Sequence, residues 1–216
     1  MKIAILTFDG FNEIDSFVSF HILSRIEQEG WKVAITCPSE TVQSTNGVRI
    51  TAQQPLEFAN DADAVLFGGS PRSREIAEEK SIMSRLELDP QRQLIGSQCA
   101  GAWFLAKLGL LATRPVCTTL RSRPELEAKG IQVLDRPFVA SDNVASAGGC
   151  LASPYLAAWV MLRLAGREAT EKALGIVAPV GEKKQYVAGV LDVVSPFVAA
   201  GTKRVATGRT AARAQS

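Results

Sequence analysis

The segment GSQCAG, residues 96–101, holds the cysteine best placed for chemistry in this chain. Cys99 follows the predicted strand 94–98 and precedes the helical segment AGAWFLAKLG, so we expect it at a sharp strand-to-helix turn. Such a nucleophile elbow tolerates little beyond Gly, Ala or Ser beside the nucleophile, because the flanking positions approach neighbouring strands. Free N–H groups and the helix dipole at a helix N-terminus favour the thiolate. The spacing predicts a reactive Cys99, while the alternative is a small buried apolar residue.

The other three cysteines, Cys37, Cys117 and Cys150, lack this setting. None belongs to a C-x-x-C pair, which favours free thiols in a reducing compartment over disulfides or zinc. We therefore expect no metal, and the thiol chemistry described below implies no organic cofactor. Cys37 and Cys117 are expected to be structural, whereas Cys150 follows Gly148-Gly149, a loop that could border a pocket.

The elements that must position Cys99 follow an alternating order. Short apolar runs rich in Ile and Val alternate with segments of helical period, which is typical of a mostly parallel sheet covered by helices. Asn46-Gly47 predicts a hairpin turn, and Ser122-Arg-Pro-Glu125 predicts a capping box at the start of a short helix. Strands are expected at 3–8, 31–37, 64–67, 94–98, 116–119, 131–134, 138–140 and 144–146. Helices are expected at 12–29, 70–88, 100–109, 154–164 and 168–177, together with the short helix that starts at 122.

One α/β domain is expected over residues 1–178, followed by a C-terminal extension, 179–216, that is partly packed or disordered. The extension contains AGVLDVVSPFVAAG, which is apolar enough to pack on the domain or on a partner. The last sixteen residues carry four basic and no acidic side chains. The rest of the chain has 20 basic against 22 acidic residues, a balance that argues against nucleic-acid binding by the domain.

Membrane insertion and secretion are not expected. The N-terminal apolar run is too short for a signal peptide, which predicts a cytoplasmic protein. The uncharged stretch 144–162 is interrupted by Gly148-Gly149 and by Pro154, so we expect a buried loop and helix there.

Three segments carry a resemblance to the ThiJ/PfpI family of the class I glutamine-amidotransferase-like superfamily: LTFDGFNEIDSF at 6–17, LFGGSP at 66–71 and GSQCAGAW at 96–103. The resemblance covers roughly residues 2–176, and the SAGGCLAS loop is most similar to the isonitrile-hydratase group. It implies a flavodoxin-like three-layer sandwich, usually a homodimer, whose elbow cysteine lies near a carboxylate of the first helix. Cys99 matches that cysteine and Asp15 that carboxylate, with Glu13 as the weaker candidate for the acid.

The same resemblance implies an oxyanion or substrate-binding site at Gly69, Ser70, Ala100 and Gly101, in which backbone N–H groups stabilise negative charge. Structural alternatives exist for these positions. Gly68-Gly69 could serve merely to permit a tight turn into a helix capped by Ser70. Asp15 stands three residues after Asn12, which is the spacing of a capping box.

Two departures from the family pattern narrow the chemistry. Leu120 stands where many members have a histidine, and Ala100 stands where the isonitrile-hydratase group commonly has a threonine. His21, the single histidine of the chain, is expected to be a structural helix residue. A thiol beside a carboxylate suits the addition of water to a small electrophile better than peptide hydrolysis, which needs a base near the nucleophile. We expect a cysteine-dependent enzyme, hydratase-like or acting on reactive carbonyls; the alternative is a non-enzymatic ligand or redox sensor linked to regulation.

Overall fold

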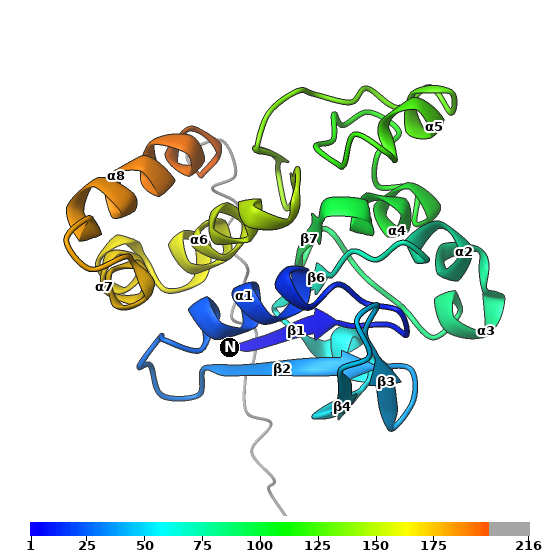
Figure 1. Cartoon of the computed structure of the whole chain (residues 1–216), viewed down its shortest axis with the longest axis horizontal. Coiled ribbons are helices and arrows are strands. Elements are labelled where there is room, and N and C mark those ends of the chain that lie inside the picture. The colour runs from blue at the N-terminus through cyan, green and yellow to red at the C-terminus, as the bar shows by residue number, and fades with distance from the viewer. Residues whose placement is uncertain (199–216) are drawn as a thin grey trace, which may run out of the picture.

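A seven-stranded sheet in the order β5-β2-β1-β6-β7-β9-β8 organises the molecule. The computed structural model describes residues 1–198 (Figure 1). All pairings in this sheet are parallel except β8 with β9, as the alternating sequence pattern predicts. The strands are β1 (Lys2–Leu6), β2 (Lys32–Cys37), β5 (Gln54–Pro55), β6 (Ala64–Phe67), β7 (Leu94–Gln98), β8 (Phe138–Ser141) and β9 (Val144–Ala147).

Helices cover both faces of this sheet (Figure 1). Ile3 and Ile5 of β1 pack toward one face, while Ala4 and Leu6 pack toward the other, because successive side chains of a strand alternate. The first face carries α1 (Glu13–Leu23), α6 (Ser153–Leu164), α7 (Arg167–Val177) and α8 (Lys183–Val194). The second carries α2 (Ser73–Glu78), α3 (Lys80–Met83), α4 (Ala102–Lys107) and α5 (Arg123–Glu127). The predicted α/β three-layer sandwich is confirmed.

Helix α1 begins where predicted but ends early. The side chain of Asn12 accepts a hydrogen bond from the amide of Ile14, as expected for an N-cap. The helix ends at Leu23 rather than at residue 29, because other groups satisfy its last carbonyls: the Ser24 hydroxyl donates to the Phe20 carbonyl, and the indole of Trp31 donates to that of Leu23.

The single helix predicted over 70–88 is wrong, because the segment forms α2 and α3. Glu79 separates them with an extended backbone, ψ 103°. Arg72, and not Ser70, occupies the N-cap of α2. The Ser70 hydroxyl instead accepts a hydrogen bond from the Arg72 amide within the preceding turn.

The strands predicted at 116–119 and 131–134 are also wrong, since these segments share only an isolated bridge between Val116 and Val133. They do not join the main sheet, because β9 takes the edge of β7. The predicted capping box of Ser122 is absent, since its side chain makes no bond to α5. The predicted hairpin is confirmed as β3 (Thr41–Gln43) paired with β4 (Arg49–Thr51).

Beyond residue 178, helix α8 packs against α6 and α7, and Val190, Leu191 and Val194 are buried. The part of the apolar extension up to residue 198 therefore lies against helices α6 and α7. The remaining extension lies outside the described residues. Within residues 1–198, no helix combines the length and the hydrophobicity needed to cross a membrane.

Candidate active site

The predicted elbow is a one-turn 3-10 segment, η2 (Cys99–Gly101), between β7 and α4. Cys99 has φ +59°, a left-handed conformation that non-glycine residues adopt mainly at constrained sites. A Cβ on Gly101 would lie 2.5 Å from the carbonyl oxygen of Phe67 in β6. The glycine two positions after the cysteine is therefore required, because the elbow approaches the neighbouring strand closely at this point.

Asp15 lies in the first turn of α1 and is connected to the loop after β6. Its Oδ2 accepts a hydrogen bond of 3.1 Å from the Gly69 amide, while the Asn12 amide donates to the Gly69 carbonyl at 3.1 Å. The capping-box alternative for Asp15 is therefore wrong, because the Asn12 amide already has a different acceptor. A Cβ on Gly69 would lie 2.5 Å from Oδ2 of Asp15, so the loop can approach the carboxylate only as glycine.

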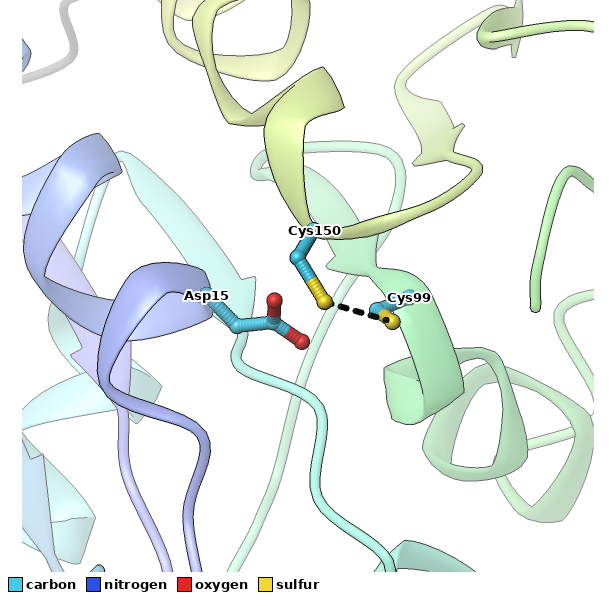
Figure 2. A group of neighbouring side chains, drawn as sticks. All are labelled: Asp15, Cys99 and Cys150. Carbon is cyan, nitrogen blue, oxygen red and sulfur yellow. Dashed lines mark hydrogen bonds between the residues drawn. The ribbon is translucent and has the colours of Figure 1, made fainter. Parts of the chain in front are cut away.

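The structure brings a second sulfur to this site. Asp15, Cys99 and Cys150 each direct one potential ligand atom to a common point, and these atoms all lie within 4.8 Å of one another (Figure 2). The two sulfurs are 3.5 Å apart although the residues are separated by 51 positions. Cys150 begins η3 (Cys150–Ala152) before α6, and its sulfur accepts a hydrogen bond of 3.1 Å from Nδ2 of Asn12.

Burial dominates the electrostatics of Asp15, which is 2% exposed. Loss of solvation raises its pKa to about 6, although the two thiols and the Gly69 amide act in the opposite direction. Among the described groups, Oδ1 of Asp15 has no hydrogen-bond partner. Asp15 thus holds a proton more tightly than an ordinary carboxyl group.

The resting ionisation of Cys99 differs from the sequence-based expectation. Burial, the Asp15 charge and the neighbouring Cys150 raise the pKa of the Cys99 thiol well above its usual range, and the Ala100 amide opposes this only in part. The expected thiolate at the helix N-terminus is therefore wrong for the state with ionised Asp15. Protonation of Asp15 removes the adjacent negative charge and so lowers the pKa of the thiol, while the effect of burial stays.

The same three side chains are the described residues able to hold a metal ion, because thiolates and a carboxylate are ligands that Zn²⁺ accepts. The sequence predicts no metal from the absence of C-x-x-C spacing. Such spacing rules detect only ligands that are close in the chain, and Cys99 and Cys150 meet through the tertiary fold.

A cavity of about 340 Å³ opens on Asp15 and Cys99. Its other lining residues are Asn12, Gly69, Ser70, Pro71, Arg74, Ala100, Trp103, Thr119, Arg121, Ser122 and Glu125. Cys99 and Cys150 also border a second, more open cavity of about 680 Å³ that includes Thr118, Leu120 and Gly149. The elbow cysteine is thus reachable from solvent although it is only 7% exposed.

Two of the four expected oxyanion residues are already engaged through their amides. The Gly69 amide donates to Asp15, and the Ser70 amide donates to the Ser73 hydroxyl at 2.8 Å. Both amides of the loop after β6 thus donate to side chains of the protein, so the expectation that Gly69 and Ser70 offer free donors is wrong. The Ala100 amide lowers the pKa of the Cys99 thiol, and Gly101 lies against Phe67.

The remaining candidates lie away from the reacting groups. Glu13 accepts hydrogen bonds from Ser44 and Asn46 at the β3–β4 hairpin, so it stabilises this turn. His21 is an exposed residue in the last turn of α1. Leu120 is 83% exposed at the rim of the second cavity, where the family histidine is expected.

Comparison with known proteins agrees with this architecture. A ThiJ/PfpI family protein from Pseudomonas syringae has 19% identity and a TM-score of 0.73, with 92% of this chain and 89% of that chain covered. Schizosaccharomyces pombe DJ-1 has 17% identity and a TM-score of 0.71, covering 83% and 100%. A mutant of a DJ-1 superfamily protein from Salmonella typhimurium has 26% identity and a TM-score of 0.70, covering 82% and 98%.

A search of curated proteins by sequence finds no match. The family model described as "DJ-1/PfpI family" matches residues 1–162, which include Asp15, Cys99 and Cys150. The chain belongs to the DJ-1/PfpI family.

Proposed function

We propose that this protein is a cysteine-dependent enzyme that adds water to a small electrophile, either an isonitrile or a reactive carbonyl compound. The observation that carries the proposal is the placement of Cys99 and Asp15. Their sulfur and carboxylate oxygen lie within 4.8 Å of each other, and both residues line the cavity of about 340 Å³. The resemblance of the SAGGCLAS loop to the isonitrile-hydratase group makes isonitriles the first substrates to examine.

Proton exchange between the two groups starts the isonitrile reaction. The Cys99 thiol transfers its proton to Asp15, and the resulting thiolate attacks the terminal carbon of the isonitrile. Asp15 returns the proton to that carbon, so a C–S bond and a C–H bond form and a thioimidate results. Water adds to the same carbon, the C–S bond breaks, and sulfur leaves as the thiol; the product is an N-substituted formamide.

A 2-oxoaldehyde uses the same groups. The thiolate attacks the aldehyde carbon, and Asp15 protonates the oxygen to form a hemithioacetal. Transfer of the aldehyde hydrogen to the neighbouring carbon gives a thioester of a 2-hydroxy acid. Water then cleaves the thioester, releases the acid and restores the Cys99 thiol. The raised pKa of Asp15, about 6, suits a group that gives and takes a proton near neutral pH.

Peptide hydrolysis is disfavoured because it needs a base close to the nucleophile. The chain has one histidine, His21, which is exposed in the last turn of α1 and is absent from both cavities next to Cys99. Leu120 supplies no ionisable group at the position of the family histidine.

The test is turnover of a panel of isonitriles and 2-oxoaldehydes by wild type, Cys99→Ser and Asp15→Asn. The matched control is Cys117→Ser, because Cys117 is fully buried and lies outside the cavity of Asp15 and Cys99. We expect kcat/KM to fall about a hundredfold or more in both site variants and to stay near wild type in the control. Equal activity of Cys99→Ser and wild type on every active substrate contradicts the mechanism.

A second candidate function is a non-enzymatic ligand or redox sensor linked to regulation. The raised pKa of the Cys99 thiol favours ligand sensing, because a protonated thiol can line a binding site without attacking the ligand. Binding of a panel compound that raises Tm without any product formation supports sensing. Product formation that depends on Cys99 excludes it as the sole role.

The expected homodimer and cytoplasmic location belong to the same proposal. Sedimentation equilibrium of the purified chain tests the first, and a monomer at micromolar concentration contradicts it. Cell fractionation tests the second.

A further inference from the structure

We infer that Cys150 is the resolving cysteine for Cys99, and that the two thiols reduce hydroperoxides by forming an intramolecular disulfide. This activity goes beyond the addition of water to an electrophile. It shares Cys99 with the proposed function but requires no isonitrile or carbonyl turnover, so each of the two can fail while the other holds.

The distance between the sulfurs is the first support. They lie 3.5 Å apart, and a disulfide bond is about 2.05 Å long, so closure needs an approach of about 1.5 Å. Figure 2 shows both side chains directed toward each other from the turn after β7 and the loop before α6. No other cysteine takes part in this cluster: Cys37 and Cys117 are 1% and 0% exposed.

The backbone directly before Cys150 has open space beside it. Gly149, directly before it, has φ +86°, and a Cβ built there meets no atom within 4 Å. Cys150 is only half-buried, whereas Cys99 is buried, so the partner sulfur lies on the more open side. The side-chain amide of Gln98 donates hydrogen bonds to the carbonyls of Gly149 and Cys150. These bonds hold the loop in its position in the reduced protein.

Burial and the Asp15 charge raise the pKa of the Cys150 thiol, and the contact with Asn12 acts in the opposite direction. Nδ2 of Asn12 donates a hydrogen bond to the Cys150 sulfur at 3.1 Å, and this donor stabilises a developing thiolate. A thiol held so close reacts as an intramolecular nucleophile, with an effective concentration far above that of free peroxide. Disulfide formation is therefore expected to outrun the second oxidation of Cys99.

The chemistry balances without a cofactor. The Cys99 thiolate attacks one oxygen of the hydroperoxide, the O–O bond breaks, and the other oxygen leaves as an alcohol or water after accepting a proton, for which Asp15 is the nearest acid. The product is a sulfenic acid on Cys99. The Cys150 sulfur then attacks the Cys99 sulfur, the S–O bond breaks, and water leaves. Two thiols lose two electrons in total, and an external dithiol restores them.

The decisive test uses the full wild-type chain, reduced and treated with a chelator, then exposed to equimolar hydrogen peroxide. Trypsin places the cysteines on separate peptides, because Lys107 lies between Cys99 and Cys117 and Lys129 between Cys117 and Cys150. We expect a Cys99–Cys150 linked peptide under non-reducing conditions and the loss of two of the four free thiols. Sulfinic acid on Cys99 with Cys150 still reduced, or four unchanged thiols, overturns the inference.

Variants give the second arm. With at least two equivalents of hydrogen peroxide, Cys150→Ser is expected to convert Cys99 to sulfinic acid. The variant is also expected to lower dithiothreitol-dependent peroxide consumption about tenfold or more. Cys37→Ser, which removes a cysteine outside the cluster, is the control and is expected to form the linked peptide like wild type. Peroxide consumption by Cys150→Ser at the wild-type rate overturns the inference. The wild-type peptide map decides the question if a variant fails to fold.

Discussion

The Gly69 amide donates a hydrogen bond of 3.1 Å to Oδ2 of Asp15, while Oδ1 has no partner among the described groups. A buried carboxylate in which one oxygen has no partner is poorly stabilised in its charged form. Its pKa accordingly rises from 3.8 to about 6. The folded state therefore binds this proton more tightly than the unfolded chain does.

This difference predicts how Asp15 affects stability with pH. The stability linked to its protonated form is fully present below about pH 4 and is lost as pH rises through 6, by about 3 kcal/mol for a pKa difference of about 2. Asp15→Asn, which keeps an oxygen for the Gly69 amide, is therefore expected to be about 1–3 kcal/mol more stable than wild type at pH 8. The gain should disappear near pH 4. Urea unfolding at both pH values measures it, and an equal difference at both contradicts the prediction.

Cys99 reactivity is expected to depend on the charge of Asp15. Asp15→Asn removes that charge and so lowers the pKa of the thiol, which raises the thiolate fraction. Alkylation of Cys99 by iodoacetamide at pH 7.5 should become about tenfold faster than in wild type. Peptide mass spectrometry follows each cysteine, and buried Cys37 and Cys117 serve as internal controls. An unchanged Cys99 rate means that the carboxylate does not control the thiol.

Gly69 is predicted to be irreplaceable by alanine. The added Cβ would lie 2.5 Å from Asp15 Oδ2 and 2.8 Å from both the Ala100 amide nitrogen and the Gln98 carbonyl oxygen. Gly69→Ala should lower the free energy of unfolding by about 1–3 kcal/mol and displace Asp15 from the elbow, with loss of turnover.

The matched control for this substitution is Gly189→Ala. Gly189 lies inside α8, and a Cβ there meets no atom within 4 Å. Alanine should stabilise the helix by about 0.5–1 kcal/mol and leave turnover unchanged. Urea unfolding compares both variants with wild type. Similar effects at the two positions would falsify the close-approach argument for Gly69.

The two acids in the first turn of α1, Glu13 and Asp15, are expected to differ in their contribution to turnover. Glu13 hydrogen-bonds to Ser44 and Asn46, away from the sulfur cluster, whereas Asp15 belongs to it. Glu13→Gln is expected to keep kcat/KM within about twofold of wild type, since surface changes of this kind shift stability by only about 0.5 kcal/mol. Asp15→Asn should lose activity. A large loss in Glu13→Gln shows that the hairpin contributes to the reaction.

Much of this architecture follows from local sequence. The apolar run at 64–67 becomes a fully buried parallel strand, because Ala, Val, Leu and Phe suit a strand covered on both faces. Residues 94–98, which begin with Leu-Ile, are also a fully buried parallel strand. The position of Cys99 between such a strand and a small-residue helix start also identifies the elbow. The predictions of a strand at 116–119 and of one long helix at 70–88 are wrong. Sheet edges and breaks within helices depend on tertiary contacts, which the local sequence pattern does not contain.

The sequence by itself determined the layered α/β order, from its alternating pattern, and the elbow cysteine, from the residues around Cys99. The acid of the first helix came from the resemblance of residues 6–17 to the family. Only the tertiary structure decided that Cys150 lies 3.5 Å from Cys99, across 51 positions of chain. It also decided that Asp15 is buried enough to keep a proton and to oppose the thiolate. Burial and neighbouring charge are sums over groups from α1, β7 and the loop before α6, and no single segment carries that information.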